Sequence, residues 1–380
     1  MSRIDDLIQE LCPDGVERRP LGSLGKRNKG TAITASKMKA IGGGGPIRVF
    51  AGGQTVADVA EDAIPATDVV RVPSIIVKSR GHIGFSYYER PFTHKTELWS
   101  YTIDVAGVDQ KFIYYYLLTQ IDNLQALARA TSVKLPQLSV RDTDTLRVPV
   151  PPLEVQREIV RVLDAFTQLE AELEAELEAR RTQYQHYLRS VVLPDGEIEW
   201  TTLDEATLNL DRKRRPVTRA DRQGGEYPYY GANGVQDYVH DYIFDGTFLL
   251  VGEDGSVKNV DGTPILNWAV GKIWVNNHAH VLTAAGKHFN LRYLYHYLAT
   301  VDVTTYVTGG TQPKINQKNL NKIPVPLVPR SYQDEVVSVL DKFDALVNDI
   351  SLGLPAELAA RRKQYEHYRD RLLTFKELTA

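Results

Sequence analysis

Apolar side chains recur three or four positions apart along two long stretches of the chain, a spacing that predicts two helices. The first stretch runs from Leu153 to about Val192, with apolar positions Ile159, Leu163, Phe166, Leu169, Leu173, Leu177, Tyr184, Leu188 and Val191. The second has a heptad-like seam at Val336, Leu340, Phe343, Val347, Ile350 and Leu354. A helix of about 37 residues spans roughly 55 Å, which is too long for burial in one domain. We therefore predict that the two helices pair as an antiparallel coiled coil; the alternative is that each packs only on its own domain.

The two predicted helices are copies of one another. Residues 162–164 and 179–187 read VLD and ARRTQYQHY, while residues 339–341 and 360–368 read VLD and ARRKQYEHY. Both copies follow a Pro-Val-Pro step, at 149–151 and 324–326. The repeat reaches the start of the chain, because Pro13-Asp14-Gly15 matches Pro194-Asp195-Gly196, so residues 1–12 correspond to the end of a long helix. A repeat arranged in this circular way predicts a pseudo-twofold relation between two units, with the two chain ends meeting in space.

The copies differ in length by four residues. Asp164 precedes Arg180 by sixteen positions, whereas Asp341 precedes Arg361 by twenty, in a stretch that contains Gly353. The first helix there carries a tandem unit, Leu-Glu-Ala-Glu, at 169–172 and 173–176. Four residues add about 6 Å of helix and turn its face by only about 40° beyond a full turn. Adding or deleting a unit is therefore predicted to change the separation of the flanking domains in small steps, each near two base pairs of duplex.

The segments between the helix copies have a mixed pattern. Short strand-like runs at 74–78 and 247–251 alternate with glycine-rich turns, and one helix is expected in each segment, at 109–120 and 289–300. The predicted fold class is α+β, with two globular mixed domains separated by the two long antiparallel helices. The expected order is a short helix at 1–12, a first globular domain at 13–148, a central long helix at 149–193, a second globular domain at 194–323 and a distal long helix at 324–380.

Composition places the chain among globular proteins. Hydrophobic residues make up 43% and charged residues 24%, which is enough apolar material for real cores. The single cysteine, Cys12, excludes an internal disulfide framework and fits a reducing compartment. Neither a signal peptide nor a membrane-spanning run is indicated, so we expect a cytoplasmic protein with no membrane partner.

Catalytic machinery is missing from the sequence. There is no phosphate-binding loop of the G-x-x-x-x-G-K-[ST] form and no Asn/Asp-Pro-Pro-aromatic step of amino-methyltransferases. One cysteine cannot build a zinc site, and the His278-x-His280 pair has no partner at helical spacing. Glu253-Asp254 is better explained as a solvated turn than as a metal site. We therefore predict no catalytic residue, no metal site and no cofactor for this chain, against the alternative of a free-standing enzyme with an unfamiliar site.

The two globular segments are rich in side chains that contact bases and phosphates, although the net charge of −3 argues mildly against a nucleic-acid partner. Asn and Gln can read adenine, and Arg or Lys can read guanine or neutralise phosphate. The candidates in the first segment are Lys26, Arg27, Lys29, Lys78, Arg80, Tyr87, Lys95 and Lys134. Those in the second are Arg212, Lys213, Tyr229, Tyr230, Asn233, Asn276, Asn277, His278 and Lys314. Taken singly, each tyrosine is better explained by partial burial in a core.

These features together resemble the specificity subunit of type I restriction-modification systems. The resemblance covers essentially the whole chain and includes the repeated ARRxQYxHY ends, the tandem LEAE unit, and the strings YPYYGANG at 227–234, WVNNHAHV at 274–281 and GGTQPKI at 309–315. The first globular segment matches less, keeping mainly TSVKLP at 131–136.

The resemblance implies a non-catalytic subunit whose two target-recognition domains each read one half of a split, asymmetric site in double-stranded DNA. The helices would set the spacer and dock the partners, with Leu169, Leu173, Leu177, Phe343, Val347 and Ile350 as the helix positions expected to matter. The implied partners are two modification subunits, which methylate adenine with S-adenosylmethionine, and restriction subunits, which use ATP and Mg²⁺. A non-enzymatic coiled-coil adaptor that recognises protein or glycan remains the alternative.

Overall fold

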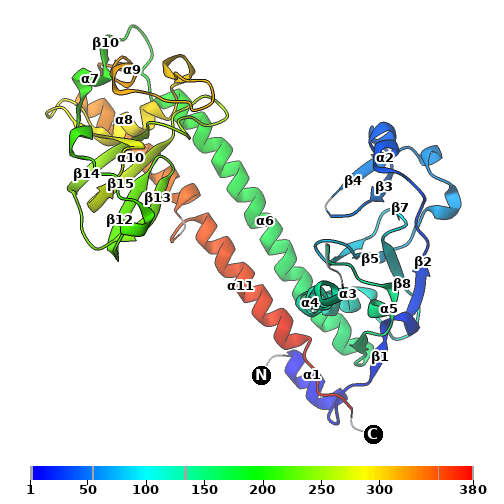
Figure 1. Cartoon of the computed structure of the whole chain (residues 1–380). Coiled ribbons are helices and arrows are strands. Elements are labelled where there is room, and N and C mark those ends of the chain that lie inside the picture. Colours follow the sequence, from blue (N-terminus) through cyan, green and yellow to red (C-terminus); the bar gives the residue numbers. More distant parts are fainter. Residues whose placement is uncertain (1–2, 54, 132–134, 350, 379–380) are drawn as a thin grey trace. The chain divides into compact units, whose positions relative to one another are not determined.

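The computed structural model describes residues 3–53, 55–131, 135–349 and 351–378 of the chain. Its contacts divide it into two compact units: unit 1 is Met1–Glu172 with Ala359–Ala380, and unit 2 is Leu173–Leu358. The longest helix, α6 (Leu153–Val191), supplies its first half to unit 1 and its second half to unit 2 (Figure 1). Each unit also holds one globular domain.

The domain of unit 1 is built mainly from short strands, with four α-helices among its described residues. Its four-stranded sheet has the order β2-β8-β5-β6, and a smaller sheet has the order β4-β3-β7. Strands β1 and β9 pair as a separate ribbon beside α6. The elements are α1 (Arg3–Leu11), β1 (Arg18–Pro20), β2 (Gly25–Asn28), α2 (Ala35–Ile41), β3 (Ile47–Phe50), β4 (Val56–Val59), β5 (Ser74–Lys78), β6 (Gly84–Tyr88), β7 (Phe92–His94), β8 (Trp99–Ile103), α3 (Gln110–Thr119), α4 (Ile121–Thr131), α5 (Val140–Asp144) and β9 (Arg147–Pro149).

The domain of unit 2 repeats this topology with one larger sheet. Its six strands have the order β11-β16-β14-β15-β12-β13, and β10 pairs with β17 as β1 does with β9. The long β15 pairs antiparallel with β14 and parallel with β12. In the first domain two separate strands make these pairings, because β6 pairs antiparallel with β5 and β7 pairs parallel with β3. The elements are β10 (Trp200–Thr202), α7 (Leu203–Ala206), β11 (Thr207–Asn209), β12 (Gly224–Gly231), β13 (Gly234–Val239), β14 (Phe244–Gly252), β15 (Leu266–Val275), β16 (Ala279–Ala284), α8 (Leu291–Leu298), α9 (Gln317–Leu320), β17 (Pro324–Pro326), α10 (Arg330–Asn348) and α11 (Leu354–Leu372).

The sequence-based elements of the two domains are confirmed. The strand at 74–78 is β5, the run at 247–251 lies inside β14, and the helices near 109–120 and 289–300 are α3 and α8. Both helices begin after a side chain that caps them: Asp109 accepts from two backbone N–H groups of α3, and Asn290 does the same for α8. The α+β fold class with two similar domains is therefore correct, whereas α4 was not predicted.

The long helices pair antiparallel inside each unit. In unit 1, Phe166 of α6 contacts Tyr365 and Tyr368 of α11, and four residues later Glu170 pairs with Arg362 at 2.6 Å. In unit 2, Tyr187 contacts Phe343 of α10, and the hydroxyl of Tyr332 donates to the carbonyl of Val191. Partner numbers fall as α6 numbers rise, which confirms the predicted antiparallel pairing. The alternative of separate helices is excluded within both units.

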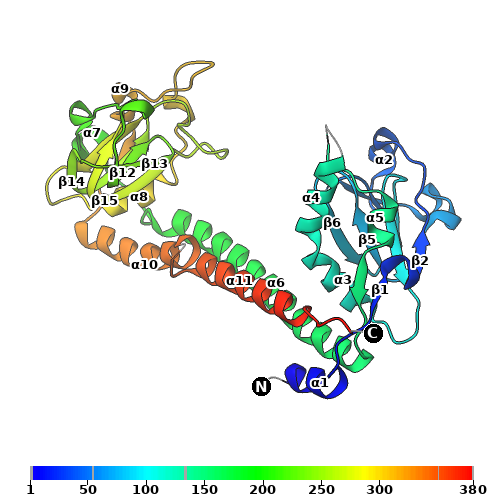
Figure 2. The ribbon, with the colours of Figure 1, turned by 60° about the horizontal axis from the view of Figure 1, so that its bottom comes forward.

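The distal helix is interrupted, so the prediction of a second continuous rod was wrong. α10 ends at Asn348 and α11 begins at Leu354 (Figure 2). The side chain of Asp349 accepts from the backbone N–H groups of Ser351 and Leu352, which ends the regular helix. The chain turns so tightly that a Cβ on Gly353 would lie 2.5 Å from the carbonyl oxygen of Ala345. The four additional residues of this copy therefore form a break and add no helical length.

The seam positions differ in burial. Leu177 and Val347 are buried, whereas Leu169, Leu173 and Phe343 are half-buried, and Ile350 lies outside the described residues.

The two ends of the repeat are hydrogen-bonded to each other within unit 1. The N–H of Val16 donates to the carbonyl of Lys376 at 2.8 Å, and the N–H of Leu378 donates to the carbonyl of Val16. This confirms that the beginning and the end of the repeat meet.

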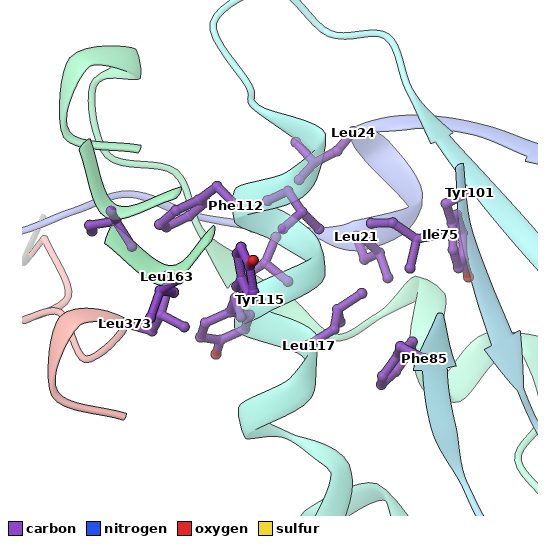
Figure 3. Close-up of a cluster of buried hydrophobic side chains, with 14 of the residues drawn as sticks. Leu21, Leu24, Ile75, Phe85, Tyr101, Phe112, Tyr115, Leu117, Leu163 and Leu373 are labelled. Carbon is purple, nitrogen blue, oxygen red and sulfur yellow. The ribbon is translucent and has the colours of Figure 1, made fainter. Parts of the chain in front are cut away.

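A single apolar core joins the domain of unit 1 to its helices. In Figure 3, Phe112 and Tyr115 of α3 lie toward Leu163 of α6, while Leu117 lies on the side of Ile75. The helix α3 is thus packed between the sheet and α6, and α8 occupies the same place in unit 2, where Tyr293 and Leu294 are fully buried. Among the described residues no helix combines the length and apolar composition needed to cross a bilayer.

Candidate nucleic-acid interface

Turns from five parts of the second domain meet at one end of its sheet. The N–H of Asn276, before β16, donates to the carbonyl of Tyr230 at 3.1 Å. The N–H of Glu253, after β14, donates to the carbonyl of His278, and the N–H of Ile315 donates to the carbonyl of Glu253. We call the resulting group, residues 211–215, 231–234, 253–255, 276–278 and 312–315, the second loop cluster. Backbone hydrogen bonds fix the mutual positions of these turns.

The first domain gathers equivalent turns with the same hydrogen bonds. The N–H of Lys95 donates to the carbonyl of Phe50, as Asn276 does to Tyr230. The N–H of Leu138 donates to the carbonyl of Ser79, as Ile315 does to Glu253. We call residues 29–31, 50–51, 78–81, 94–97 and 135–138 the first loop cluster. The same surface is thus built twice from side chains that differ.

The second loop cluster presents amides and cations to solvent. The exposed candidates are Arg212, Lys213, Asn233, Asn277, His278 and Lys314. His278 is fixed at its base, because its backbone N–H donates to the side-chain oxygen of Asn276 at 2.8 Å and its ring contacts Asp254. Such pre-positioned donors and acceptors suit recognition of base edges and phosphates.

Two of the predicted contact residues are buried. Tyr229 is 1% exposed and its hydroxyl bonds the backbone of Val217, so it would have to leave the core to stack on a base, and that prediction was wrong. Asn276 is 3% exposed, and its amide nitrogen faces Gln236 at 3.4 Å. It holds the turn that presents Asn277 and His278. Tyr230, the neighbour of Tyr229 on β12, is half-buried.

A buried ionic network supports the second loop cluster. Arg214 donates to Glu253 at 2.5 Å and lies 3.3 Å from Asp211, while His280 contacts Asp211 and the carbonyl of Ile315. Burial on its own would raise the pKa of Asp211, but the hydrogen bond to His280 keeps that pKa below its usual value. The network ties the strand β16 to three separate turns.

The same network includes a trio of potential metal ligands. Ligand atoms of Asp211, Glu253 and His280 lie within 4.8 Å of one another. The carboxylates already face cations, because Arg214 contacts both of them and Lys314 lies 3.0 Å from Glu253. Both ring nitrogens of His280 face oxygen acceptors in the protein. The trio is therefore a structural ion network and a poor cation site.

The first domain brings only part of its predicted residues to the first loop cluster. Lys29, Lys78, Arg80 and Lys95 lie in or beside it, with Lys95 paired to Glu97 at 2.7 Å. Lys134 lies outside the described residues.

The remaining candidates of this domain are placed elsewhere. Arg27 pairs with Asp144 of α5 at 2.8 Å, and its strand neighbour Lys26 is exposed farther from the turns. Tyr87 packs beside Tyr114 of α3 at the other end of β6. Tyr87 therefore lies away from the first loop cluster, because the strand direction separates the two ends of β6.

The structure also adds residues that the sequence patterns missed. Gln236 is exposed on β13 beside Asn276. Arg215 is also exposed, and its backbone N–H donates to the carbonyl of Val275. In the first domain Gln137 occupies the place that Lys314 has in the second, since both follow a proline that accepts from a glycine N–H. The tight glycine turn at 231–234 was the signal that could have placed Gln236 on the returning strand.

Comparisons with known proteins agree with this architecture. Residues 13–179 and 204–360 each match the model of the type I restriction modification DNA specificity domain. A Haemophilus influenzae protein described as a type I restriction enzyme specificity subunit is 40% identical over 191 residues, which is 49% of each chain, so the match spans about half of that relative. A type I restriction enzyme specificity subunit of Escherichia coli is 30% identical over 289 residues, or 70% of each chain.

Solved structures show the same fold. The S subunit of a type I restriction-modification system from M. genitalium aligns over 94% of this chain and 96% of its own, with a TM-score of 0.62 and 17% identity. A chain from work on complex assembly of the type I R-M system aligns over 95% of this chain and 98% of its own, with a TM-score of 0.56 and 15% identity.

Proposed function

This chain belongs to the family of type I restriction-modification DNA specificity domains, and we propose that each of its two domains reads one half of a split site in double-stranded DNA. The observation that carries the proposal is the pair of loop clusters, which share a backbone frame and differ in their exposed side chains. Two loop clusters with the same backbone arrangement and different exposed side chains suit two different half-sites. Linking two domains that each bind one half-site with modest affinity raises the overall affinity through effective concentration. This favours DNA recognition over a protein or glycan adaptor.

In this proposal the chain supplies recognition and its partners supply the chemistry. Two modification subunits would transfer a methyl group from S-adenosylmethionine to adenine, and restriction subunits would use ATP and Mg²⁺. The paired helices are the proposed docking elements for these subunits, and the expected compartment is the cytoplasm. The helical length between the two domains would set the gap between the half-sites, since α6 belongs to both units.

The proposal is tested by sequencing the methylome of a host that expresses this chain with its modification subunit. We expect a split adenine-methylated motif that disappears when the chain is omitted. A variant of the chain with the exposed-loop substitutions Asn233→Ala and Asn277→Ala should alter one half of the motif only. Absence of any motif that depends on the chain, with expression and assembly confirmed, would contradict the proposal.

A further inference from the structure

A buried glutamine joins each domain to the first turns of its long helix in the same way. The side-chain oxygen of Gln156 in α6 accepts from the backbone N–H of Asp109 at 2.7 Å, and its amide donates to the carbonyls of Gly107 and Pro151. Gln333 in α10 accepts from the N–H of Asn290 at 2.7 Å. Both glutamine side chains are fully buried with these groups satisfied, so each fixes the helix against the cap of the domain's own helix.

The second glutamine also repeats the donor side of the arrangement. The amide of Gln333 donates to the carbonyls of His288 and Val328. His288 lies two residues before Asn290, as Gly107 does before Asp109. Val328 precedes Gln333 by five residues, as Pro151 precedes Gln156. The backbone partners of the two glutamines therefore correspond position by position.

A second contact point lies two turns farther along each long helix. Asp164 and Asp341 follow the two glutamines by eight residues in each case. In unit 1, Asp164 accepts from the ammonium of Lys111 at 2.8 Å and from the hydroxyl of Tyr115. Burial of Tyr115 raises the pKa of its phenol, and the contact with Asp164 adds to that effect. The phenol is thus held as a hydrogen-bond donor.

In unit 2 the same positions carry different chemistry. Asp341 accepts from Arg292 at 2.7 Å and contacts the ring Nε2 of His296 at 2.7 Å, and Arg292 also reaches Asp344 at 2.6 Å. Arg292 and His296 lie two and six residues after Asn290, as Lys111 and Tyr115 do after Asp109. Lys111 and Tyr115 of unit 1 are thus replaced by Arg292 and His296 in unit 2, but both contacts to the aspartate are retained.

We infer that these two residue sets are positioning clamps that hold each recognition domain at a fixed angle on its long helix and thereby keep the gap between half-sites strict. The first clamp is Asp109, Lys111, Tyr115, Gln156 and Asp164; the second is Asn290, Arg292, His296, Gln333 and Asp341. Core packing alone would hold a domain on a helix, but apolar contact is non-directional. Directional hydrogen bonds at two points, two turns apart, also fix the rotation of the domain about the helix. The inference about the gap rests on the proposed function.

The first test measures domain movement without DNA. Spin labels at Arg90→Cys in the domain and Ala171→Cys on α6, both exposed, are placed in the full chain with Cys12→Ser. The clamp variant is Lys111→Met with Tyr115→Phe, which keeps both apolar bodies, and the matched control is the neighbouring Tyr114→Phe. We expect the distance distribution to broaden about twofold in the clamp variant and not in the control. An unchanged width in the clamp variant would overturn the inference whatever the chain does on DNA.

The second test reads the gap by methylome sequencing with the modification subunit. In the clamp variant, and in Gln156→Met or Gln333→Met, both half-site sequences should persist. Methylation at sites whose gap is one base pair longer or shorter should rise about tenfold, in line with the loss of a hydrogen bond to a charged or buried group. Lys111→Arg in place of Lys111→Met, which restores the cation, should recover the strict gap.

Two outcomes in the clamp variant would overturn the inference: a gap as strict as in the parent chain, or loss of one half-site with the other retained. Absence of any motif in the parent chain would instead count against the proposed function, and the spin-label result would still decide the clamp.

Discussion

The ring of Phe166 in α6 stacks on the ring of Tyr368 in α11, with centroids 5.5 Å apart and planes inclined by 26°. In unit 2, Tyr187 of α6 stacks on Phe343 of α10 at 5.1 Å and 28°. Phe166 and Phe343 occupy the same position of the repeat, as do Tyr187 and Tyr368. The same aromatic pair is therefore built twice, with the two helix copies exchanging roles, and this relation fixes the antiparallel register in each unit.

The stacking should be measurable as a coupling energy. Replacing Tyr368 by Leu keeps an apolar side chain but removes the stack on Phe166, so we expect a loss of about 0.5 to 1.5 kcal/mol beyond the change in buried area. Denaturant unfolding of the single and double variants Phe166→Leu and Tyr368→Leu gives the coupling directly. Phe166→Leu combined with Tyr187→Leu is the control, because these residues lie about six turns apart on α6 and their effects should add. Additivity in the stacked pair would show that the contact carries no energy of its own.

The exposed amide of Asn277 should contribute to sequence recognition in one half-site. Asn277→Ala is expected to relax specificity there by about 1 to 3 kcal/mol, the value of one bidentate base contact, while the other half-site keeps its preference. Binding of the assembled complex to a panel of duplexes with single base changes measures this. Equal weakening on every duplex would place Asn277 on the DNA backbone.

The buried neighbour Asn276 supplies the matched comparison for Asn277. Its side-chain oxygen accepts from the backbone N–H of His278, and the residue is buried. Asn276→Ala would leave that N–H unpaired at a cost of about 1 to 3 kcal/mol, so we expect lower thermal stability of unit 2 together with weaker binding to all sequences. A change of base preference with unaltered stability would show that Asn276 turns outward to the DNA.

The local patterns predicted much of the fold because helix periodicity and capping are local properties. The spacing of Leu163 and Phe166 fixed which side of α6 meets its partner, and Asp109 marked the start of α3. Burial in the loop clusters depends on distant partners and could not be predicted in this way. Tyr229 and Tyr230 look alike in sequence, yet strand alternation and the Val217 contact bury only the first. The break at Gly353 likewise depends on the carbonyl of Ala345 in the preceding turn.

Acid should destabilise unit 2 through His296. Burial lowers the pKa of His296 below its usual value, although the contact with Asp341 opposes this shift. In the unfolded chain the pKa is about 6.5, so below that pH the unfolded state binds the proton more readily than the folded state. Stability is therefore fully present above about pH 6.5 and is lost as the pH falls from there through the folded-state pKa. His296→Gln should flatten the dependence of the melting temperature on pH in this window. An unchanged slope in His296→Gln would mean that other groups cause the acid sensitivity.

Deleting Leu173–Glu176 should shorten the gap between the half-sites and keep the half-sites themselves. The deletion removes about 6 Å of helix, near two base pairs, and rotates the remainder of α6 by about 40°. Methylome sequencing of the deletion variant beside the parent chain measures the gap directly. Substituting Glu174 and Glu176 by Gln, which keeps the length, should leave the gap unaltered. The same gap in both chains would show that α6 does not set the spacing.

Arg212 and Arg214 should separate DNA contact from domain stability, although they are two residues apart. Arg214 is the largely buried partner of Glu253 and Asp211, so Arg214→Met would remove one cation from two carboxylates that keep Lys314 and His280 as neighbours, at a cost of about 1 to 3 kcal/mol. Arg212 is exposed, and Arg212→Met should change stability by less than about 0.5 kcal/mol. If Arg212 neutralises a phosphate, its loss should weaken binding evenly across sequences and reduce the slope of log K against log salt by about 1. Chemical unfolding and salt titration of both variants check the two halves of this prediction. Stability loss in Arg212→Met, or unaltered stability in Arg214→Met, would contradict the assignment of the first to DNA and the second to the support beneath it.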